Sequence, residues 1–320
     1  MKNNDYVVVI GAANIDIGGT PYKPLIPGDS NPGVIKMSYG GVGRNIAHNL
    51  ALLGISVELI TAIGDDTLGK EMLKKCESTG MDTSLSLIVP DASTSTYLFI
   101  NDENGEMDLA LSHVDIVKHI TPEYVESLSD VINSAAIVIA DCNLTQETLL
   151  KLMDICTVPL YIDTVSVSHA DKIKGHLAGI DTLKPNLLEA EYLTDMIIEN
   201  EYDCLEAAHA LIEQGIRRVF ISLGPNGMIA ADKDHTLKAD RYPAEVKCTT
   251  GAGDSAMAAI IWSSLKDGGE ELEYPVKAAN AAASATISVD PTIHPAMSSD
   301  LIEKMLDEYE VDIKEIKYKK

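Results

Sequence analysis

Short apolar runs rich in β-branched residues alternate with longer helical patterns along most of this chain, and this alternation limits the possible folds. The runs that predict strands are residues 7–12, 57–63, 136–140, 159–163 and 218–223. The segments that predict helices are residues 43–53, 69–78, 146–156, 186–196 and 204–214. Apolar strands separated by helices are typical of a mostly parallel sheet covered on both faces. The sequence therefore predicts an α/β protein with a mostly parallel central sheet.

Two segments interrupt this alternation and contain no helical pattern of their own. Residues 17–39 hold a glycine pair, several prolines and an alternating run, and residues 94–112 hold two alternating runs around Asn104-Gly105, a strong hairpin signal. We expect them to form a small separate sheet that acts as a lid over the α/β domain. The predicted α/β domain comprises residues 1–16, 40–93 and 114–320, and the predicted lid comprises residues 17–39 and 94–113.

Composition excludes several classes of partner. The 320 residues can bury one large core, with or without a second small domain, and 49 acidic against 25 basic residues give a net charge of −24. Such a surface repels nucleic acid and anionic membranes, and no apolar stretch approaches the roughly 18 residues of a membrane span. We expect neither nucleic acid nor membrane as a partner. Because an uncovered lid face or edge would seek a partner, we expect a homodimer through the lid.

The cysteines and the N-terminal segment bear on location. The five cysteines are scattered without CxxC spacing, which fits neither a disulfide framework nor a structural zinc site. The apolar run at residues 7–13 is short and continues into Asn14 and Asp16, so it predicts a strand rather than a signal peptide. We therefore expect a cytoplasmic protein.

The glycine-rich segment at residues 249–255 carries the strongest chemical signal. It precedes an apolar run that predicts a buried helix, whose unpaired N–H groups and dipole could hold an anion. Gly251 and Gly253 would let the anion approach the backbone, and Asp254 could take a proton from a hydroxyl. The alternative is a glycine turn with Asp254 or Ser255 as a helix N-cap.

Two motifs suit a small polar substrate. Asn14 and Asp16 follow the first strand, where open α/β sheets bind ligands, and they could hydrogen-bond sugar hydroxyls; an Asx turn is equally compatible. Residues 40–47 open a helix with three glycines, so a ligand could touch the backbone beside Asn45, with Arg44 adding charge. Tight helix packing is the alternative explanation for these glycines.

Two further motifs suit a nucleotide. Asn186 and Glu189 share a helix face and could hold a hydrated Mg²⁺ or its phosphate, but the same spacing is a helix capping box. Residues 222–227 predict a hairpin turn, and whether they also line a nucleotide site stays open at this point.

Two nucleotide-binding motifs are excluded. Residues 64–71 have Walker A spacing, but Glu71 stands where Ser or Thr is needed, and Asp65 and Asp66 would repel phosphates. No GxGxxG follows the first strand, which argues against a dinucleotide-dependent dehydrogenase.

In this order, the motifs resemble those of the ribokinase-like (PfkB-type) sugar and nucleoside kinases over nearly the whole chain. The resemblance implies a three-layer α/β fold with a mostly parallel central sheet and a β-sheet lid, and phosphorylation of a primary hydroxyl with ATP and Mg²⁺. It implies that Asp254 is the general base, that Gly251, Ala252 and Gly253 form an anion hole, and that Glu189 organises the metal. The implied nucleotide-binding residues are Lys184, Asn186, Ser222, Gly224, Gly227, Thr250 and Asn280.

Within this family, residues 29–33, 40–45, 96–98, 104–107 and 163–166 resemble those of pseudouridine kinases. This resemblance implies conversion of pseudouridine to pseudouridine 5′-phosphate, with Ser30, Asn31 and Arg44 meeting the base. The implied substrate-binding residues are Asn14, Asp16, Ser30, Asn31, Gly40, Gly41, Arg44, Asn45, Thr96 and Asn143.

Some residues depart from the pattern. Cys248 stands where many relatives have Asp beside a monovalent-cation loop, which leaves potassium activation open, and His113 and His169 leave the substrate open. The alternatives are a kinase for another nucleoside or for free ribose or fructose, and a non-catalytic nucleoside- or sugar-binding regulator on the same scaffold.

Overall fold

A computed structural model describes residues 6–316 of the chain, apart from the Asp267 side chain, so the first five and last four residues of the predicted α/β domain lie outside it. A central sheet of ten strands has the order β16-β15-β14-β13-β12-β11-β10-β1-β4-β6. Pairing is parallel from β6 to β13 and antiparallel from β13 to β16, as predicted for a mostly parallel sheet. The strands are β1 (Tyr6–Ile10), β4 (Ser56–Ile60), β6 (Met81–Asp82), β10 (Ile137–Asp141), β11 (Leu160–Asp163), β12 (Thr182–Lys184), β13 (Arg218–Ser222), β14 (Met228–Ala231), β15 (Thr236–Ala239) and β16 (Ile313–Glu315).

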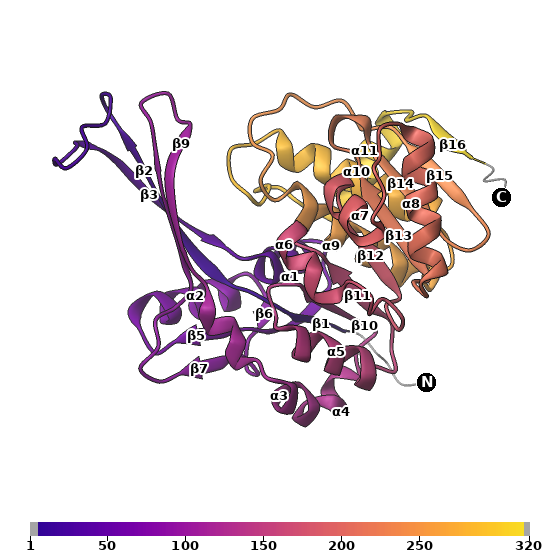
Figure 1. Cartoon of the computed structure of the whole chain (residues 1–320), viewed down its shortest axis with the longest axis horizontal. Coiled ribbons are helices and arrows are strands. Elements are labelled where there is room, and N and C mark those ends of the chain that lie inside the picture. The colour runs from indigo at the N-terminus through magenta and orange to yellow at the C-terminus, as the bar shows by residue number, and fades with distance from the viewer. Residues whose placement is uncertain (1–5, 317–320) are drawn as a thin grey trace.

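Helices cover both faces of this sheet and give the predicted three layers (Figure 1). Residues of β1 alternate between two separate cores, with Val7 and Val9 in one and Val8 and Ile10 in the other. The first core includes α1 (Val42–Leu52), α2 (Thr67–Ser78), α9 (Ala252–Asp267), α10 (Glu273–Ile287) and α11 (Ser299–Glu308). The second includes α3 (Pro122–Ser127), α4 (Ser129–Ile132), α5 (Gln146–Ile155), α6 (Val167–Ala170), α7 (Leu187–Thr194) and α8 (Glu201–Glu213). None of the helices in the described part of the chain is long and apolar enough to cross a membrane.

The predicted strand at residues 57–63 is two strands, so that prediction is wrong. β4 ends at Ile60, and β5 (Ala62–Gly64) pairs with β7 (Leu87–Val89) in a separate two-stranded sheet. The ladder breaks at Thr61, whose N–H donates to the Ser86 hydroxyl at 3.1 Å. A continuous apolar run does not reveal such a break, because both pieces are buried.

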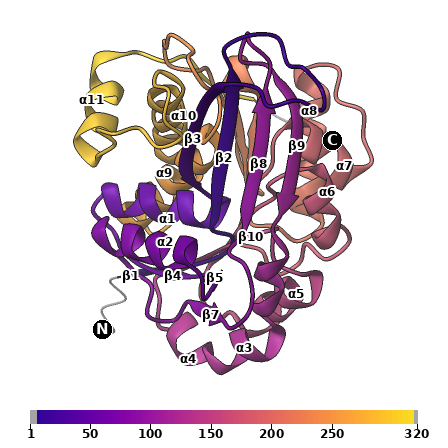
Figure 2. The same ribbon diagram turned by 90° about the vertical axis from the view of Figure 1, so that its left-hand side faces the viewer.

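The lid is a four-stranded sheet in the order β3-β2-β8-β9, and Figure 2 shows its strands side by side in front of the helical layers. Its strands are β2 (Asn14–Pro21), β3 (Gly33–Gly40), β8 (Thr96–Asn101) and β9 (Met107–His113). The predicted Asn104-Gly105 hairpin joins β8 to β9, and β2 pairs with β8 in parallel. Because β2 begins at Asn14, Asn14 and Asp16 are lid residues, which corrects the predicted boundary at residue 16.

Strand register gives the lid two distinct faces. Asp16 and Tyr97 are register partners, and Gly18 is two residues from Asp16, so all three lie on one face of the lid. We call this the inner face. The outer face carries Ile17, Ile35, Met37, Leu98, Ile100, Leu109 and Leu111. The base of the outer face packs on the body, through Ile15, Ile17 and Tyr39 in the first core.

Candidate active site

The start of α9 is built around a glycine in the left-handed region. Gly251 is the N-cap of α9 with φ +84°, and its side chain supplies no cap. A Cβ at Gly251 would lie 2.1 Å from the Thr292 carbonyl oxygen, so only glycine fits there. The alternative in which Asp254 or Ser255 caps the helix is therefore wrong. The first turn of α9 presents backbone N–H groups that no N-cap side chain satisfies, as an anion hole requires.

Asp254 lies in this first turn and is buried. Its Oδ2 accepts a hydrogen bond from Asn45 Nδ2 of α1 at 2.7 Å. Burial raises the pKa of Asp254 to about 7, and the negative charge of Asp163 adds to the rise. The hydrogen bond from Asn45 and the charges of Lys184 and Arg44 oppose it. A carboxylate with this pKa can accept a proton at neutral pH.

Two consecutive glycines bring the lid and the start of α1 together. A Cβ at Gly41, which has φ +96°, would lie 2.3 Å from the Ala12 carbonyl oxygen, and one at Gly40 would lie 2.3 Å from Asp16 Oδ2. Asn14 Nδ2 donates to Asp16 Oδ1 at 2.5 Å. Burial raises the pKa of Asp16 to about 6 against the opposing charge of Arg44. This cluster brings together an amide, a carboxylate and backbone groups that one small polar ligand could contact.

A buried ion pair beside the predicted anion hole joins Lys184, a predicted nucleotide-binding residue, to Asp163, which was not predicted as a site residue. Lys184 Nζ lies 3.2 Å from Asp163 Oδ2, and both side chains are almost completely buried. Although burial alone would lower it, the nearby charges of Asp163 and Glu189 raise the pKa of Lys184. A Cβ at Gly253 would lie 3.4 Å from Lys184 Nζ, so the ammonium group lies against the glycine turn. Asp163 and Lys184 are register partners at the ends of β11 and β12, a signal visible once the strand order is known.

A cavity of about 370 Å³ adjoins the anion hole on the α10 side. Its lining includes the predicted residues Asn186, Ser222, Gly224, Gly227, Gly253 and Asn280, together with Arg241, Val246, Ala283 and Ile287, which were not predicted. The predicted hairpin turn at residues 222–227 joins β13 to β14. Gly227 has φ +82°, and a Cβ there would meet the Ala239 carbonyl oxygen at 2.0 Å. Thr250 is exposed in the turn before α9, and the cavity reaches its neighbour Thr249.

Comparison with known proteins decides the family. Residues 4–299 match the pfkB family carbohydrate kinases. This chain belongs to the PfkB family. It is 37% identical to the pseudouridine kinase of Escherichia coli over 93% of this chain and 95% of that protein. A structure described as a sugar kinase from Clostridium perfringens is 31% identical, covers 99% of both chains and superposes with a TM-score of 0.87. A ribokinase II of E. coli solved with ATP and Mg²⁺ has a TM-score of 0.80 at 17% identity, covering 95% of this chain and 99% of that one.

Members of the PfkB family transfer a phosphoryl group to a hydroxyl, so this chain is a phosphotransferase. In this PfkB-family kinase, Asn186 and Glu189 form the capping box of α7. Glu189 Oε2 accepts from the Asn186 N–H at 2.8 Å and from Thr164 Oγ1 at 2.5 Å, and Glu189 Oε1 accepts from Asn186 Nδ2 at 2.6 Å. The capping alternative is confirmed. It leaves both Glu189 oxygens engaged within the protein.

A Mg²⁺ ion fits this site only if it arrives with the nucleotide. No group of three or more ligating side chains occurs among the described residues. Asp163 Oδ2, buried beside the anion hole, has no hydrogen-bond partner besides its ion pair with Lys184. Mg²⁺ commonly keeps several waters and binds through one or two carboxylates plus substrate phosphates. Asp163 and Glu189 suit that kind of binding through water.

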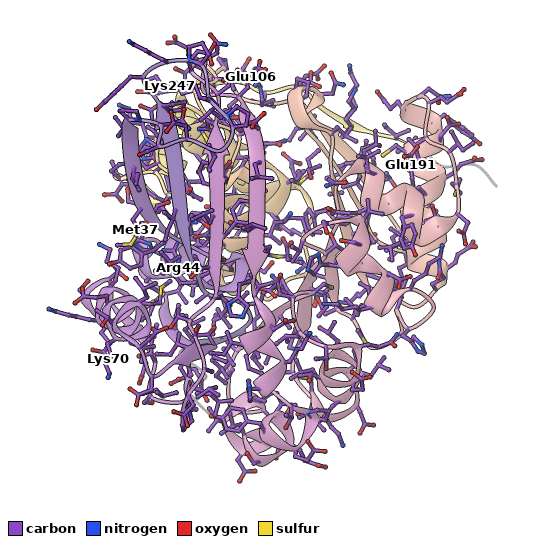
Figure 3. All side chains as sticks on the ribbon, turned by 60° about the vertical axis from the view of Figure 1, so that its left-hand side comes forward. Met37, Arg44, Lys70, Glu106, Glu191 and Lys247 are labelled. Atoms are coloured by element: carbon purple, nitrogen blue, oxygen red, sulfur yellow. The ribbon has the colours of Figure 1, made fainter. Side chains whose placement is uncertain are left out.

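The PfkB-family kinase uses Arg44 differently from the prediction. Its side chain is only 2% exposed, so it lies below the ligand site rather than in it. Nε donates to the Gly40 carbonyl at 3.1 Å, Nη2 donates to the Tyr39 carbonyl at 2.6 Å and to Asn45 Oδ1, and Nη1 contacts His48 Nδ1 at 3.2 Å. Figure 3 shows Arg44 at the base of the lid, far below Glu106 at the lid's tip. Arg44 therefore orients the amide of Asn45 toward Asp254 instead of meeting the substrate's base.

The structure does not bring Ser30, Asn31 or Thr96 to this site. Asn31 closes its own loop by bonding to Ile26 and Asp29. It also lines a cavity with the outer-face residues Ile17, Ile35, Leu98 and Ile100 and with Phe99. In Figure 1 this loop projects to the left of the lid strands, away from the helical layers. Thr96 is in register with Ile15 and so lies on the opposite face from Asp16. Side chains one residue apart in a strand point to opposite faces, and the sequence did not show which face each occupies.

Asp141 is a further group that the prediction missed. This buried carboxylate accepts from the Ala12 N–H at 2.9 Å and the Gly43 N–H at 2.7 Å through Oδ2, and from the Asn143 N–H at 2.9 Å through Oδ1. A Cβ at Gly11 would lie 2.3 Å from Asp141 Oδ2. Asp141 thus ties the loop after β1 and the start of α1 to the predicted substrate residue Asn143, which is half-buried at the carboxyl end of β10.

Proposed function

We propose that this kinase transfers the γ-phosphoryl group of ATP to the 5′-hydroxyl of pseudouridine, giving pseudouridine 5′-phosphate. The observation that carries the proposal is the buried Asp254, held by Asn45 at 2.7 Å in an α9 turn that lacks a side-chain cap. A protein that only bound a nucleoside would gain nothing from a buried carboxylate with a pKa of about 7. The choice of pseudouridine rests on similarity to the pseudouridine kinase of E. coli.

In the proposed reaction Asp254 removes the proton from the 5′-hydroxyl as its oxygen attacks the γ-phosphorus. The new O–P bond forms while the bond from the γ-phosphorus to the β–γ bridging oxygen breaks, and ADP leaves with the bonding electrons. The N–H groups at Gly251 to Gly253 and the ammonium of Lys184 meet the charge on the transferred group. Each such positioned donor stabilises the transition state by on the order of 3 kcal/mol. When bound with the nucleotide, Mg²⁺ would neutralise negative charge on the phosphates.

The substrate half of the site suits a ribosyl group. Asn14 and Asp16 offer a donor and acceptors to ring hydroxyls, and Gly40 and Gly41 leave the backbone open beside them. We assign the ribose to this cluster, with its 5′-hydroxyl toward Asp254. The nucleotide belongs in the cavity between the β13–β14 turn and α10, whose lining includes Ser222, Gly224 and Asn280.

An ADP-release assay with pseudouridine, uridine, inosine, ribose and fructose tests the proposal. We expect the highest kcat/KM with pseudouridine. A higher value with ribose or fructose would assign a sugar kinase instead, and ligand binding without ADP release from any substrate would leave a non-catalytic regulator.

Replacement of the base tests the mechanism. Asp254→Asn keeps the shape of the side chain and removes its basicity, so we expect roughly a 100-fold or greater loss of kcat. The matched control is Asp300→Asn, which changes an exposed carboxylate in the first turn of α11 and should retain activity. Normal turnover by Asp254→Asn would refute the assignment of the base.

We further propose that the enzyme is a homodimer that packs through the outer faces of its lids. Ile35 and Leu111 are 77% and 65% exposed on that face, and Met37 and Leu109 are exposed beside them. An apolar sheet face of this kind is rare on a monomer. Ser30 and Asn31 lie on the outer side of the lid. If they contact the base of a nucleoside, we expect that nucleoside to be the one bound by the partner subunit of the dimer.

A further inference from the structure

The inner face of the lid carries an aromatic pair directly beside the substrate cluster. Tyr97 is the register partner of Asp16, and Phe99 is the register partner of Gly18. The ring centroids of Tyr97 and Phe99 are 5.9 Å apart with an angle of 36° between the planes. Because residues two apart point the same way, both rings lie on the face that carries Asp16.

The glycine at position 18 makes room for the Phe99 ring. A Cβ at Gly18 would lie 2.4 Å and 2.6 Å from two carbons of that ring, so the ring rests on the backbone of β2. The Tyr97 hydroxyl in turn contacts Met107 Sδ at 3.6 Å. These contacts hold both rings against the inner face of the lid, where each stays partly exposed.

The two rings are not explained by core packing. The chain has two phenylalanines, and the other, Phe220, is a residue of β13 that is completely buried in the first core. Phe99 and Tyr97 are only half-buried, and neither belongs to the two hydrophobic cores of the described residues. Half-exposed aromatic rings on an inward sheet face are suited to stacking against a flat ligand.

The geometry of a nucleoside matches this placement. With the 5′-hydroxyl at Asp254 and the ring hydroxyls at Asp16, C1′ and its heterocycle extend away from α9. Phe99 lies two residues beyond the level of Asp16, about 7 Å farther along the strands. That is the distance needed to pass the ribose and reach the heterocycle. Lys36, the other register partner of Gly18, lies on the same face and offers a donor to a carbonyl of the base.

We propose that Tyr97 and Phe99 form the wall on which the nucleoside's heterocycle stacks, so that they favour a nucleoside over a free sugar. This inference rests on the proposed function, since it requires a nucleoside substrate. Stacking uses the faces of the heterocycle, which pseudouridine and uridine share, so these residues act on nucleosides as a class. Discrimination between the two belongs to groups that reach the edge of the base.

Steady-state kinetics of Phe99→Leu and Tyr97→Leu with pseudouridine and with ribose test this inference. Loss of one stacking ring should raise KM for pseudouridine about tenfold to a hundredfold, with a smaller effect on kcat. KM for ribose and KM for ATP should stay at their wild-type values. Phe99→Tyr, which keeps a ring, should recover most of the affinity that Phe99→Leu loses. Ile197→Ala, an exposed apolar substitution after α7, is the control and should behave as wild type.

If ribose is not turned over, calorimetric titration of pseudouridine into the ATP-free protein compares the affinity of the wild type with that of the two leucine variants. A wild-type KM or affinity for pseudouridine in both leucine variants would refute the stacking wall. Equal losses with pseudouridine and ribose would also refute it, since they would indicate a general disturbance of the lid. If wild-type enzyme phosphorylates no nucleoside, the proposed function itself fails, and this is seen without any variant.

Discussion

At the scale of single residues, the proton affinity of Asp254 depends on groups that act in opposite directions. Burial and the charge of Asp163 favour the neutral acid, whereas Asn45 and Lys184 favour the carboxylate. The carboxylate is thereby kept more basic than one in water, yet it stays ionised in part at neutral pH.

This balance predicts a pH dependence of activity. The pKa of Asp254 is raised to about 7, so the basic form is lost as the pH falls through that value. We expect kcat/KM for the phosphoryl acceptor to fall about tenfold per pH unit below about pH 7. A pH profile of kcat/KM from acid to mildly alkaline conditions measures this. A rate that stays constant well below pH 6 would contradict the role of Asp254.

Sequence patterns identified some residues of the candidate site and did not identify others. Asp254, Asn45 and the glycines of residues 251–253 could be found because glycine turns and helix starts are local patterns. The hydrogen bonds of Arg44 could not be predicted from the sequence, because its acceptors are backbone carbonyls that come into place only in the folded turn at Gly40. Asp163 and Asp141 were not identified as site residues, because their contacts depend on which strands are neighbours in the sheet.

At the scale of elements, register decides which lid residues can act together. The hairpin between β8 and β9 was predictable from Asn104-Gly105, but the parallel pairing of β2 with β8 joins segments about 80 residues apart in the chain. That pairing places Tyr97 beside Asp16 and turns Thr96 to the other face. Sequence alternation shows that two faces exist, and only the pairing shows which face meets the ligand.

Asp141 connects three elements, namely the loop after β1, the start of α1 and the segment after β10. Replacing it should therefore affect both stability and the proposed substrate site. Asp141→Ala would leave the buried N–H groups of Ala12 and Gly43, and the partly buried N–H of Asn143, without their acceptor. Each such group costs about 1–3 kcal/mol, so we expect a loss of several kcal/mol in the free energy of unfolding and a higher KM for the nucleoside. Urea unfolding and steady-state kinetics measure the two effects. Asp141→Asn keeps one acceptor oxygen and should lose less. Equal stability of Asp141→Ala and wild type would contradict this linking role.

At the scale of the whole molecule, the lid carries a large exposed apolar surface that another copy of the chain could bury. Its outer face is apolar across all four strands, although the chain carries a net charge of −24. The alternation of strands and helices was sufficient to predict the layers of the body. Sequence reasoning could anticipate an association through the lid, but it could not show that the loop with Ser30 and Asn31 lies on the outer side.

The proposed dimer gives a prediction at this scale. Ile35→Lys places a charge on the exposed apolar face, on its edge strand β3, and burying that charge in an interface would cost several kcal/mol. Light scattering should therefore find a dimer for the wild type and a monomer for Ile35→Lys. Ile197→Lys, an exposed apolar position away from the lid, is the control and should remain dimeric. A dimeric Ile35→Lys protein would refute this interface.

The contact between Asn45 and Asp254 spans 209 positions of the chain. During synthesis, the loops proposed to bind the sugar leave the ribosome long before the helix that carries Asp254, the proposed base, is made. A nascent or truncated polypeptide that ends before α9 therefore lacks the proposed base and anion hole, whatever it has already folded. If Asp254 is the base, we expect phosphorylation only after the C-terminal part of the chain that carries α9 has packed against the N-terminal part that carries Asn45.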